Sequence, residues 1–262
     1  MKGLLSIFKG GSAPADGSAP WVPAELPPLP APPARAAPPM IARPPVESAP
    51  WVPGALPAVP VRRKRLVFGF DATASRSDEW EAAKRLTDSL FTALPGQLDV
   101  ALAVHGGNKL HTFTGFTSEP GKLRDKAAGV QCRAGFTRLL DILGRVAALD
   151  DVTLLYIGDS FEEDETKARK LAATLGRRES RVIILQDGTD ERACKVFREI
   201  AELSGGALLP FDMSAVKRLR ELFEAVAVVA VGGTELLETK KATMPAATLL
   251  LAHLDTKRIG RR

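Results

Sequence analysis

The stretch Arg65-Leu66-Val67-Phe68-Gly69-Phe70-Asp71-Ala72-Thr73-Ala74-Ser75 decides the fold of this chain. Residues 66–70 are apolar or glycine, which predicts a strand that is buried on both faces. The strand ends on Asp71, and the hydroxyl-bearing Thr73 and Ser75 follow at alternate positions. Alternate residues of an extended segment point the same way. We therefore expect a buried strand that delivers one carboxylate and two hydroxyls to one edge of a sheet.

Strand and helix signals alternate from this stretch onward. Further strands are expected at 98–104, 109–113, 152–157, 181–185 and 207–211. Helices are expected at 77–94, 120–128, 137–149, 162–175, 189–203 and 214–231, the last ending at Gly232-Gly233. Apolar strands separated by helices are typical of a parallel sheet with both faces covered. We predict an α/β fold, a doubly wound, mostly parallel six-stranded sheet in which the 98–113 hairpin supplies one antiparallel edge strand.

Proline placement divides the 262-residue chain into parts. Sixteen of the 20 prolines precede Val61. A Pro/Ala-rich segment has too few large apolar groups to fold alone and favours polyproline II conformations. We predict a disordered Pro/Ala-rich region at 1–61, a globular domain at 62–238 and a basic tail at 239–262.

A repeat stands out in the proline-rich region. Ser18-Ala19-Pro20-Trp21-Val22-Pro23 recurs as Ser48-Ala49-Pro50-Trp51-Val52-Pro53. A tryptophan beside prolines is a suitable docking peptide, and two copies give avidity. The Trp21 and Trp51 repeats therefore indicate a possible second partner, with duplication of low-complexity sequence as the alternative.

Composition argues against several classes of protein: nucleic-acid-binding, disulfide-rich and membrane-spanning. The net charge of +5 comes largely from basic runs at 62–65 and 257–262, outside the core of the domain, so no specific nucleic-acid binding is expected. Two cysteines, Cys132 and Cys194, are too few for a disulfide framework and suit a reducing compartment. No stretch approaches the ~20 apolar residues of a membrane span. We expect a cytoplasmic protein.

Polar residues also follow another strand and open a helix. Asp159 and Ser160 come directly after the 152–157 strand, and Thr137 opens a helix after Gly135-Phe136. Ligands of open parallel sheets bind beyond the carboxyl ends of the strands. The set contains only oxygen donors, which suits a hard cation: Mg²⁺ above all, with Mn²⁺ or Ca²⁺ possible. His105 falls in the expected hairpin turn, where a surface or packing role is expected.

The ordered set Asp71-x-Thr73-x-Ser75, then Thr137, then Asp159 resembles the metal-ion-dependent adhesion site (MIDAS) of von Willebrand factor A (vWA) domains. The resemblance covers about 170 residues and includes the order of strands and helices. It implies an intracellular member of bacterial type, with Thr73, Ser75 and Thr137 as hydroxyl ligands. Asp71 and Asp159 would act on the metal directly or through water. A carboxylate from a protein partner would complete the metal shell.

The acidic run Glu162-Glu163-Asp164-Glu165 follows Asp159 closely. These acids can begin a helix, where the helix dipole favours them. Alternatively they lean over the metal, strengthen cation binding and repel an acidic ligand, so that the partner would be neutral or basic.

Rival functions remain open. A Mg²⁺-dependent phosphohydrolase of the haloacid dehalogenase type would use Asp71 as nucleophile, but position 73 holds threonine in place of a second acid. A dinucleotide-binding enzyme needs a glycine-rich turn that Gly69-Phe70-Asp71 does not supply. A metal-independent scaffold would act through the tryptophan repeats. We predict a non-enzymatic, Mg²⁺-binding adaptor.

Overall fold

The computed structural model describes residues 63–212 and 215–254. The predicted Pro/Ala-rich region with its Trp21 and Trp51 repeats lies outside the described residues, and so do residues 255–262.

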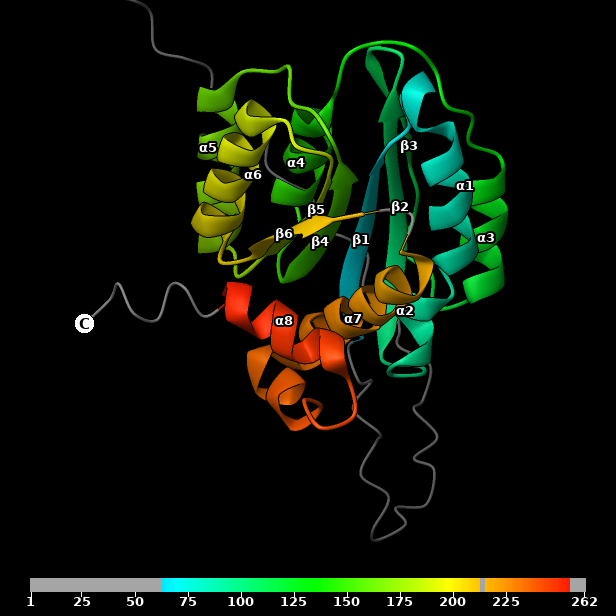
Figure 1. Cartoon of the computed structure of the whole chain (residues 1–262), viewed down its shortest axis with the longest axis vertical. Coiled ribbons are helices and arrows are strands. Elements are labelled where there is room, and N and C mark those ends of the chain that lie inside the picture. The colour runs from blue at the N-terminus through cyan, green and yellow to red at the C-terminus, as the bar shows by residue number, and fades with distance from the viewer. Residues whose placement is uncertain (1–62, 213–214, 255–262) are drawn as a thin grey trace, which may run out of the picture. The chain divides into compact units, whose positions relative to one another are not determined.

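A six-stranded sheet forms the centre of the described chain (Figure 1). Its strands are β1 (Lys64–Asp71), β2 (Leu98–Gly106), β3 (Lys109–Phe113), β4 (Val152–Gly158), β5 (Arg181–Asp187) and β6 (Ala207–Phe211). They lie in the order β3-β2-β1-β4-β5-β6. Only the β2–β3 pair is antiparallel, and it forms one edge. This arrangement confirms the predicted fold class.

The β2–β3 hairpin closes through a two-residue turn. Gly107 and Asn108 both have positive φ, at 54° and 67°. Two such residues in succession match the twist of the flanking strands, and glycine and asparagine tolerate that conformation best. The turn therefore begins two residues later than expected, since β2 continues through His105 to Gly106.

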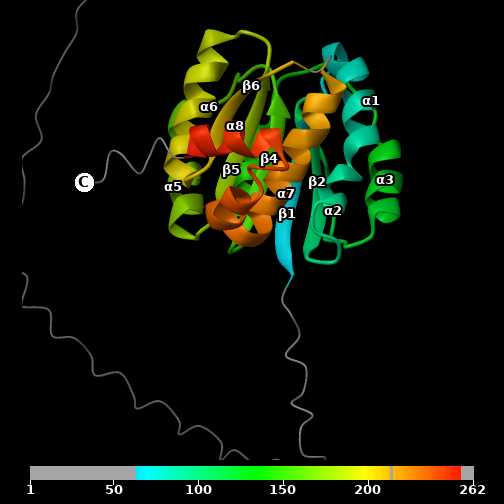
Figure 2. The same ribbon diagram turned by 60° about the horizontal axis from the view of Figure 1, so that its bottom comes forward.

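Helices cover both faces of the sheet. They are α1 (Ser77–Leu86), α2 (Ser89–Thr92), α3 (Pro120–Ala128), α4 (Leu139–Ala147), α5 (Glu165–Arg177), α6 (Glu191–Ser204), α7 (Val216–Thr239) and α8 (Pro245–Leu254), with a 3-10 turn, η1 (Ala74–Arg76). The side chains of β1 alternate between two cores: Leu66, Phe68 and Phe70 meet residues of α1, α7 and α8, whereas Val67 meets α4, α5 and α6. Figure 2 shows α7 and α8 in front of the sheet. None of the described helices is both long and apolar enough to cross a membrane.

The single helix expected at 77–94 is interrupted. α1 ends at Leu86 and α2 starts at Ser89. The Thr87 amide and hydroxyl both donate to the Lys84 carbonyl, at 3.3 and 2.9 Å. This i to i−3 contact tightens the last turn and competes with the regular helical ladder.

The C-terminal part of the domain is longer than expected. The predicted break at Gly232-Gly233 coincides with a kink, where Gly233 has non-helical φ/ψ of 67° and −164°, but the chain continues as helix to Thr239. The expected basic tail at 239–262 is wrong in its first part, because α8 buries Ala246, Ala247, Leu250 and Leu251 in the core shared with α7. Its apolar side chains, too few for a membrane span, add to the core instead.

We expect Leu250→Ala to lower the free energy of unfolding by about 2–5 kcal/mol, because a fully buried leucine leaves a cavity when truncated. The matched control is Leu249→Ala, whose side chain is 38% exposed and should change stability by about 0.5 kcal/mol or less. Urea unfolding of the full chain measures both. Equal, small effects would show that α8 does not belong to the folded domain.

Candidate functional site

The candidate site lies where the sheet reverses its winding. β1 has β2 on one side and β4 on the other, so the connections leave in opposite directions. Such a switch point opens a crevice beyond the carboxyl ends of the strands. Asp71 ends β1 and Asp159 follows β4, so both predicted acids lie at this point.

Asp71 is completely buried. Its Oδ1 accepts a hydrogen bond from the Thr73 amide at 3.1 Å, while its Oδ2 has no hydrogen-bond partner among the described residues. Burial and then the negative charge of Asp159 raise the pKa of Asp71 to about 7, against the opposing effects of Arg76 and the Thr73 amide. A buried polar atom without a partner is uncommon and calls for a function or an unseen ligand.

Thr73 and Ser75 place their hydroxyls beside each other after β1. The Thr73 Oγ1 and Ser75 Oγ atoms are 3.4 Å apart. Thr73 is partly buried and Ser75 is exposed at the start of the η1 region. Together with Asp71 they offer three oxygen donors on five residues of chain, and solvent can reach the outermost one. This donor set fits a hard cation such as Mg²⁺, whose remaining ligands would be water or partner oxygens.

Thr137 is buried and already hydrogen-bonded. Its Oγ1 accepts from the Glu162 amide at 3.1 Å, and its own amide donates to the Glu162 carboxylate at 3.2 Å. The reciprocal pair joins the loop before α4 to the loop after β4. The predicted ligand thus lies at the expected edge, with its hydroxyl engaged by a protein donor.

The acidic run caps two helices. Glu163 accepts from the Leu139 and Leu140 amides at the start of α4, which has no side-chain cap of its own. Asp164 is the N-cap of α5 and accepts from the Lys167 amide at 3.0 Å. Free amides at a helix start attract carboxylates. Of the two interpretations offered for this run, helix capping describes Glu163 and Asp164.

Asp159 is paired with an arginine that the sequence analysis did not single out. Arg76 is 3% exposed, and its Nη1 lies 3.3 Å from Asp159 Oδ2. Its Nη2 lies 3.3 Å from Asp187 Oδ2 at the end of β5. The guanidinium also lies 5.5 Å from the ring centroid of Phe70. Arg76 therefore ties the loop after β1 to the ends of β4 and β5.

His105 is the second residue that was missed. It is completely buried in β2 rather than placed in the turn, so its expected place is wrong, and of the two expected roles the structure shows packing. The Arg138 amide donates to its Nδ1 at 3.2 Å, which leaves the ring proton on Nε2 to donate to the Tyr156 hydroxyl at 2.8 Å. Burial lowers the pKa of His105 to about 3, so the ring is neutral. The 3.7 Å approach of Nδ1 to Asp71 is therefore no ion pair.

All five predicted residues lie at the carboxyl edge, and they divide into two groups. Asp71, Thr73 and Ser75 retain oxygen atoms without a strong protein donor, whereas Thr137 and Asp159 already have protein partners. The described residues contain no cluster of three or more His, Cys, Asp or Glu side chains suited to a metal ion. A cation at this edge would therefore depend on hydroxyl oxygens.

We expect Arg76→Gln to lower the free energy of unfolding by about 2–3 kcal/mol. This is less than the loss for a fully buried ion pair, because solvent reaches Asp159 and Asp187. The matched control is Arg85→Gln on α1, the helix that follows Arg76, an exposed side chain whose removal should cost about 0.5 kcal/mol or less. Thermal and urea unfolding test the difference. An Arg76→Gln protein as stable as the control would contradict the proposed tie between strands.

Comparison with known proteins identifies the architecture. No protein-family model matches the sequence, and no curated protein matches it. Among solved structures, the VWA domain of SpRpn10 is similar with a TM-score of 0.50 and 13% identity, over 60% of this chain and 95% of that chain. Proximal thread matrix protein 1 from the mussel byssus has a TM-score of 0.50 and 13% identity, over 62% of this chain and 46% of that one.

The ArnB paralog VWA2 from Sulfolobus acidocaldarius is a further match, at a TM-score of 0.42 and 12% identity, over 61% of this chain and 44% of that one. This chain thus spans less than half of the last two proteins. At such identities the likeness shows the fold alone. The strand order, the antiparallel edge hairpin and the match to the SpRpn10 domain together show that the described residues have a von Willebrand factor A-like fold.

Proposed function

We propose that the domain is a protein-interaction module that binds a divalent cation, Mg²⁺ in the first place, at Asp71, Thr73 and Ser75. The bound cation would present a positive centre at the carboxyl edge of the sheet, to which an oxygen of a protein partner adds. The observation that carries this proposal is the buried Asp71 Oδ2, which has no hydrogen-bond partner among the described residues.

The surroundings of Asp71 support a cation rather than a hydrogen bond as the missing partner. His105 Nδ1 accepts the Arg138 amide and so carries no proton to give. Burial and then the negative charge of Asp159 raise the pKa of Asp71, and a cation bound there would offset the repulsion from Asp159. Thr73 and Ser75 hydroxyls then supply neutral oxygens of the kind that Mg²⁺ accepts.

Thr137 and Asp159 would support the cation indirectly, by holding the loops that surround it. Thr137 holds the loop before α4 against Glu162, and Asp159 is held by Arg76. Both residues thus fix the positions of the loops around the cation, and a water molecule could connect either to it. The chain's own residues would bind and orient the cation, and the partner would complete its shell.

A hydrolytic role has less support. Asp71, the nucleophile that a phosphohydrolase would need, is completely buried, and position 73 supplies a hydroxyl in place of the second acid. We therefore propose a binding function without catalysis. The Trp21 and Trp51 repeats are proposed as a separate docking element for a second partner.

Calorimetric titration of the full chain with Mg²⁺ and Mn²⁺ tests the cation site. We expect saturable binding to the wild type and a loss of at least about tenfold in affinity for Thr73→Val, which keeps the side-chain shape and removes one ligand. Asp71→Asn should abolish binding, because it replaces the charged ligand. The matched control is Thr174→Val on α5, whose hydroxyl bonds the Lys170 carbonyl away from the site.

Equal binding by wild type and Asp71→Asn would sink the cation site as proposed. Absence of binding by the wild type would also count against it and would favour a metal-independent scaffold acting through the tryptophan repeats.

A further inference from the structure

Phe136 is the most exposed large apolar side chain among the described residues, with 64% of its surface accessible to solvent. It lies in the loop between α3 and α4, one residue before Thr137. Exposing a phenylalanine ring forgoes the favourable free energy of burying it. An aromatic ring left in solvent beside a candidate binding site therefore needs an explanation.

The loop that carries Phe136 is held firmly. The Phe136 amide donates to Asn108 Oδ1 at 2.7 Å, and Arg138 Nε donates to the Asn108 carbonyl at 2.8 Å. Gly135 allows this contact, because a Cβ there would lie 2.6 Å from the Gly107 Cα, and its φ is 149°. Two hydrogen bonds to one turn residue thus fix the backbone on both sides of the ring. A pre-organised aromatic residue costs little ordering entropy when a partner binds.

Three cations lie on the loop that carries Phe136 and on the adjoining hairpin. Lys109, Arg133 and Arg138 are exposed. No ion pair involves any of them within residues 63–212 and 215–254. Lys109 and Arg133 both lie near His111, since the charge of each lowers the pKa of that histidine. We call Phe136 with these three cations the Phe136 surface.

The Phe136 surface is joined directly to the candidate cation site. The Arg133 amide donates to the carbonyl of Ala72, which lies between Asp71 and Thr73, at 2.9 Å. The Gly107 amide in turn donates to the Arg133 carbonyl at 3.1 Å. The loop after β1, the loop before α4 and the hairpin turn therefore form one connected platform.

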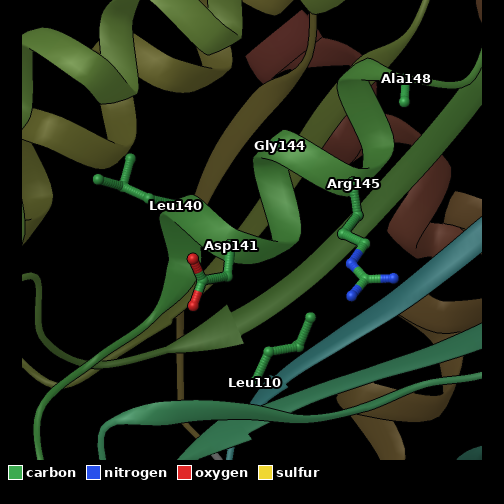
Figure 3. Close-up of a pocket in the computed structure, with 6 residues that line it drawn as sticks. All are labelled: Leu110, Leu140, Asp141, Gly144, Arg145 and Ala148. Atoms are coloured by element: carbon green, nitrogen blue, oxygen red, sulfur yellow. The ribbon is translucent and has the colours of Figure 1, made fainter.

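A groove continues from this platform between β3 and α4 (Figure 3). It has a volume of about 590 Å³ and is lined by Leu110, Leu140, Asp141, Gly144, Arg145 and Ala148. Figure 3 shows Leu110 on its strand below the row of α4 residues. The groove begins one residue after Lys109 and two residues after Arg138. Its lining is mostly apolar, with one acid and one base.

We infer that the Phe136 surface and the adjoining groove dock an acidic segment of the partner protein, one that also offers an apolar side chain or pocket to the Phe136 ring. This inference rests on the proposed function for the identity of the neighbouring cation site. Lys109 and Arg133 have no carboxylate within ion-pair distance among the described residues, Arg138 acts only at longer range on Glu163, and the three cations together complement an acidic chain. Phe136 supplies the desolvated aromatic anchor that protein interfaces favour.

The positions of the neighbouring acids favour this occupant. Glu162 and Glu163 accept backbone amides around the start of α4, so each is engaged by donors of its own domain. A partner that is neutral or basic, the alternative raised by the acidic run, would leave Lys109 and Arg133 without an acidic counterpart. Nucleic acid is also less suited, because one aromatic ring gives no row of stacking positions.

A random peptide display library selected on the full chain in Mg²⁺ tests this inference. We expect enrichment of peptides that combine Asp or Glu with apolar residues. Affinity of an enriched, fluorescently labelled peptide should fall at least about tenfold with Arg133→Glu/Arg138→Glu, and similarly with Phe136→Ser. Matched controls are Lys126→Glu/Lys195→Glu, two exposed cations without ion pairs on α3 and α6, and Leu203→Ser, another exposed apolar residue.

The inference would be overturned if the enriched peptides were neutral or basic, or if selection on the Arg133→Glu/Arg138→Glu protein enriched the same peptides as selection on the wild type. Equal losses of affinity in the control variants would also overturn it. So would tighter binding of a labelled oligo(dT) than of any peptide. Repeating the selection in EDTA separates the two proposals. Acidic peptides that still depend on Phe136 and Arg133/Arg138 without Mg²⁺ would support the docking surface even if the cation site fails. Unchanged circular dichroism and thermal unfolding show that the variants remain folded.

Discussion

Three adjacent parallel strands, β1, β4 and β5, each end in or just before an aspartate, and the need for positive charge beside these carboxylates is the constraint on which the candidate site depends. Like charges held a few ångströms apart in a poorly solvated place are costly. Arg76 offsets two of the charges by bridging Asp159 and Asp187, and it does so from an almost completely buried position. Asp71 alone is left without a cationic partner at hydrogen-bond distance.

The groups packed around Asp71 are arranged so that none of them supplies that partner. The Arg138 amide fixes the tautomer of His105, so that Nδ1, the nitrogen nearest Asp71, has no proton, and the protonated Nε2 donates a hydrogen bond to the Tyr156 hydroxyl. The loop before α4 is held by Glu162 and Glu163, which in turn keeps the Arg138 amide in place. Capping of one helix thus determines the protonation of a histidine on a neighbouring strand.

The fold could be predicted because its signals are local: apolar strands, amphipathic helices and a glycine-rich turn each depend on a few consecutive residues. Asp71, Thr73, Ser75, Thr137 and Asp159 could be placed at one edge from strand order alone. Arg76 could not, because its function depends on Asp187, and the expected end of that strand at residue 185 left Asp187 unconsidered. Three acids at one edge would have required a compensating cation. Likewise α8 was missed because ten mostly apolar residues match a tail, a core helix and a short strand equally well.

The candidate site combines a permanent positive charge, the Arg76 guanidinium, with an exchangeable one, the proposed cation at Asp71. An arginine in a buried bridge holds strand ends together continuously, since breaking it would leave two carboxylates exposed to each other. A cation at Asp71 would instead be able to come and go, because Ser75 opens that position to solvent. The structural tie and the proposed binding function then rest on different carboxylates. Loss of the cation would consequently leave the platform of Ala72, Arg133 and Gly107 intact, and a partner would meet a surface of the same shape with less positive charge.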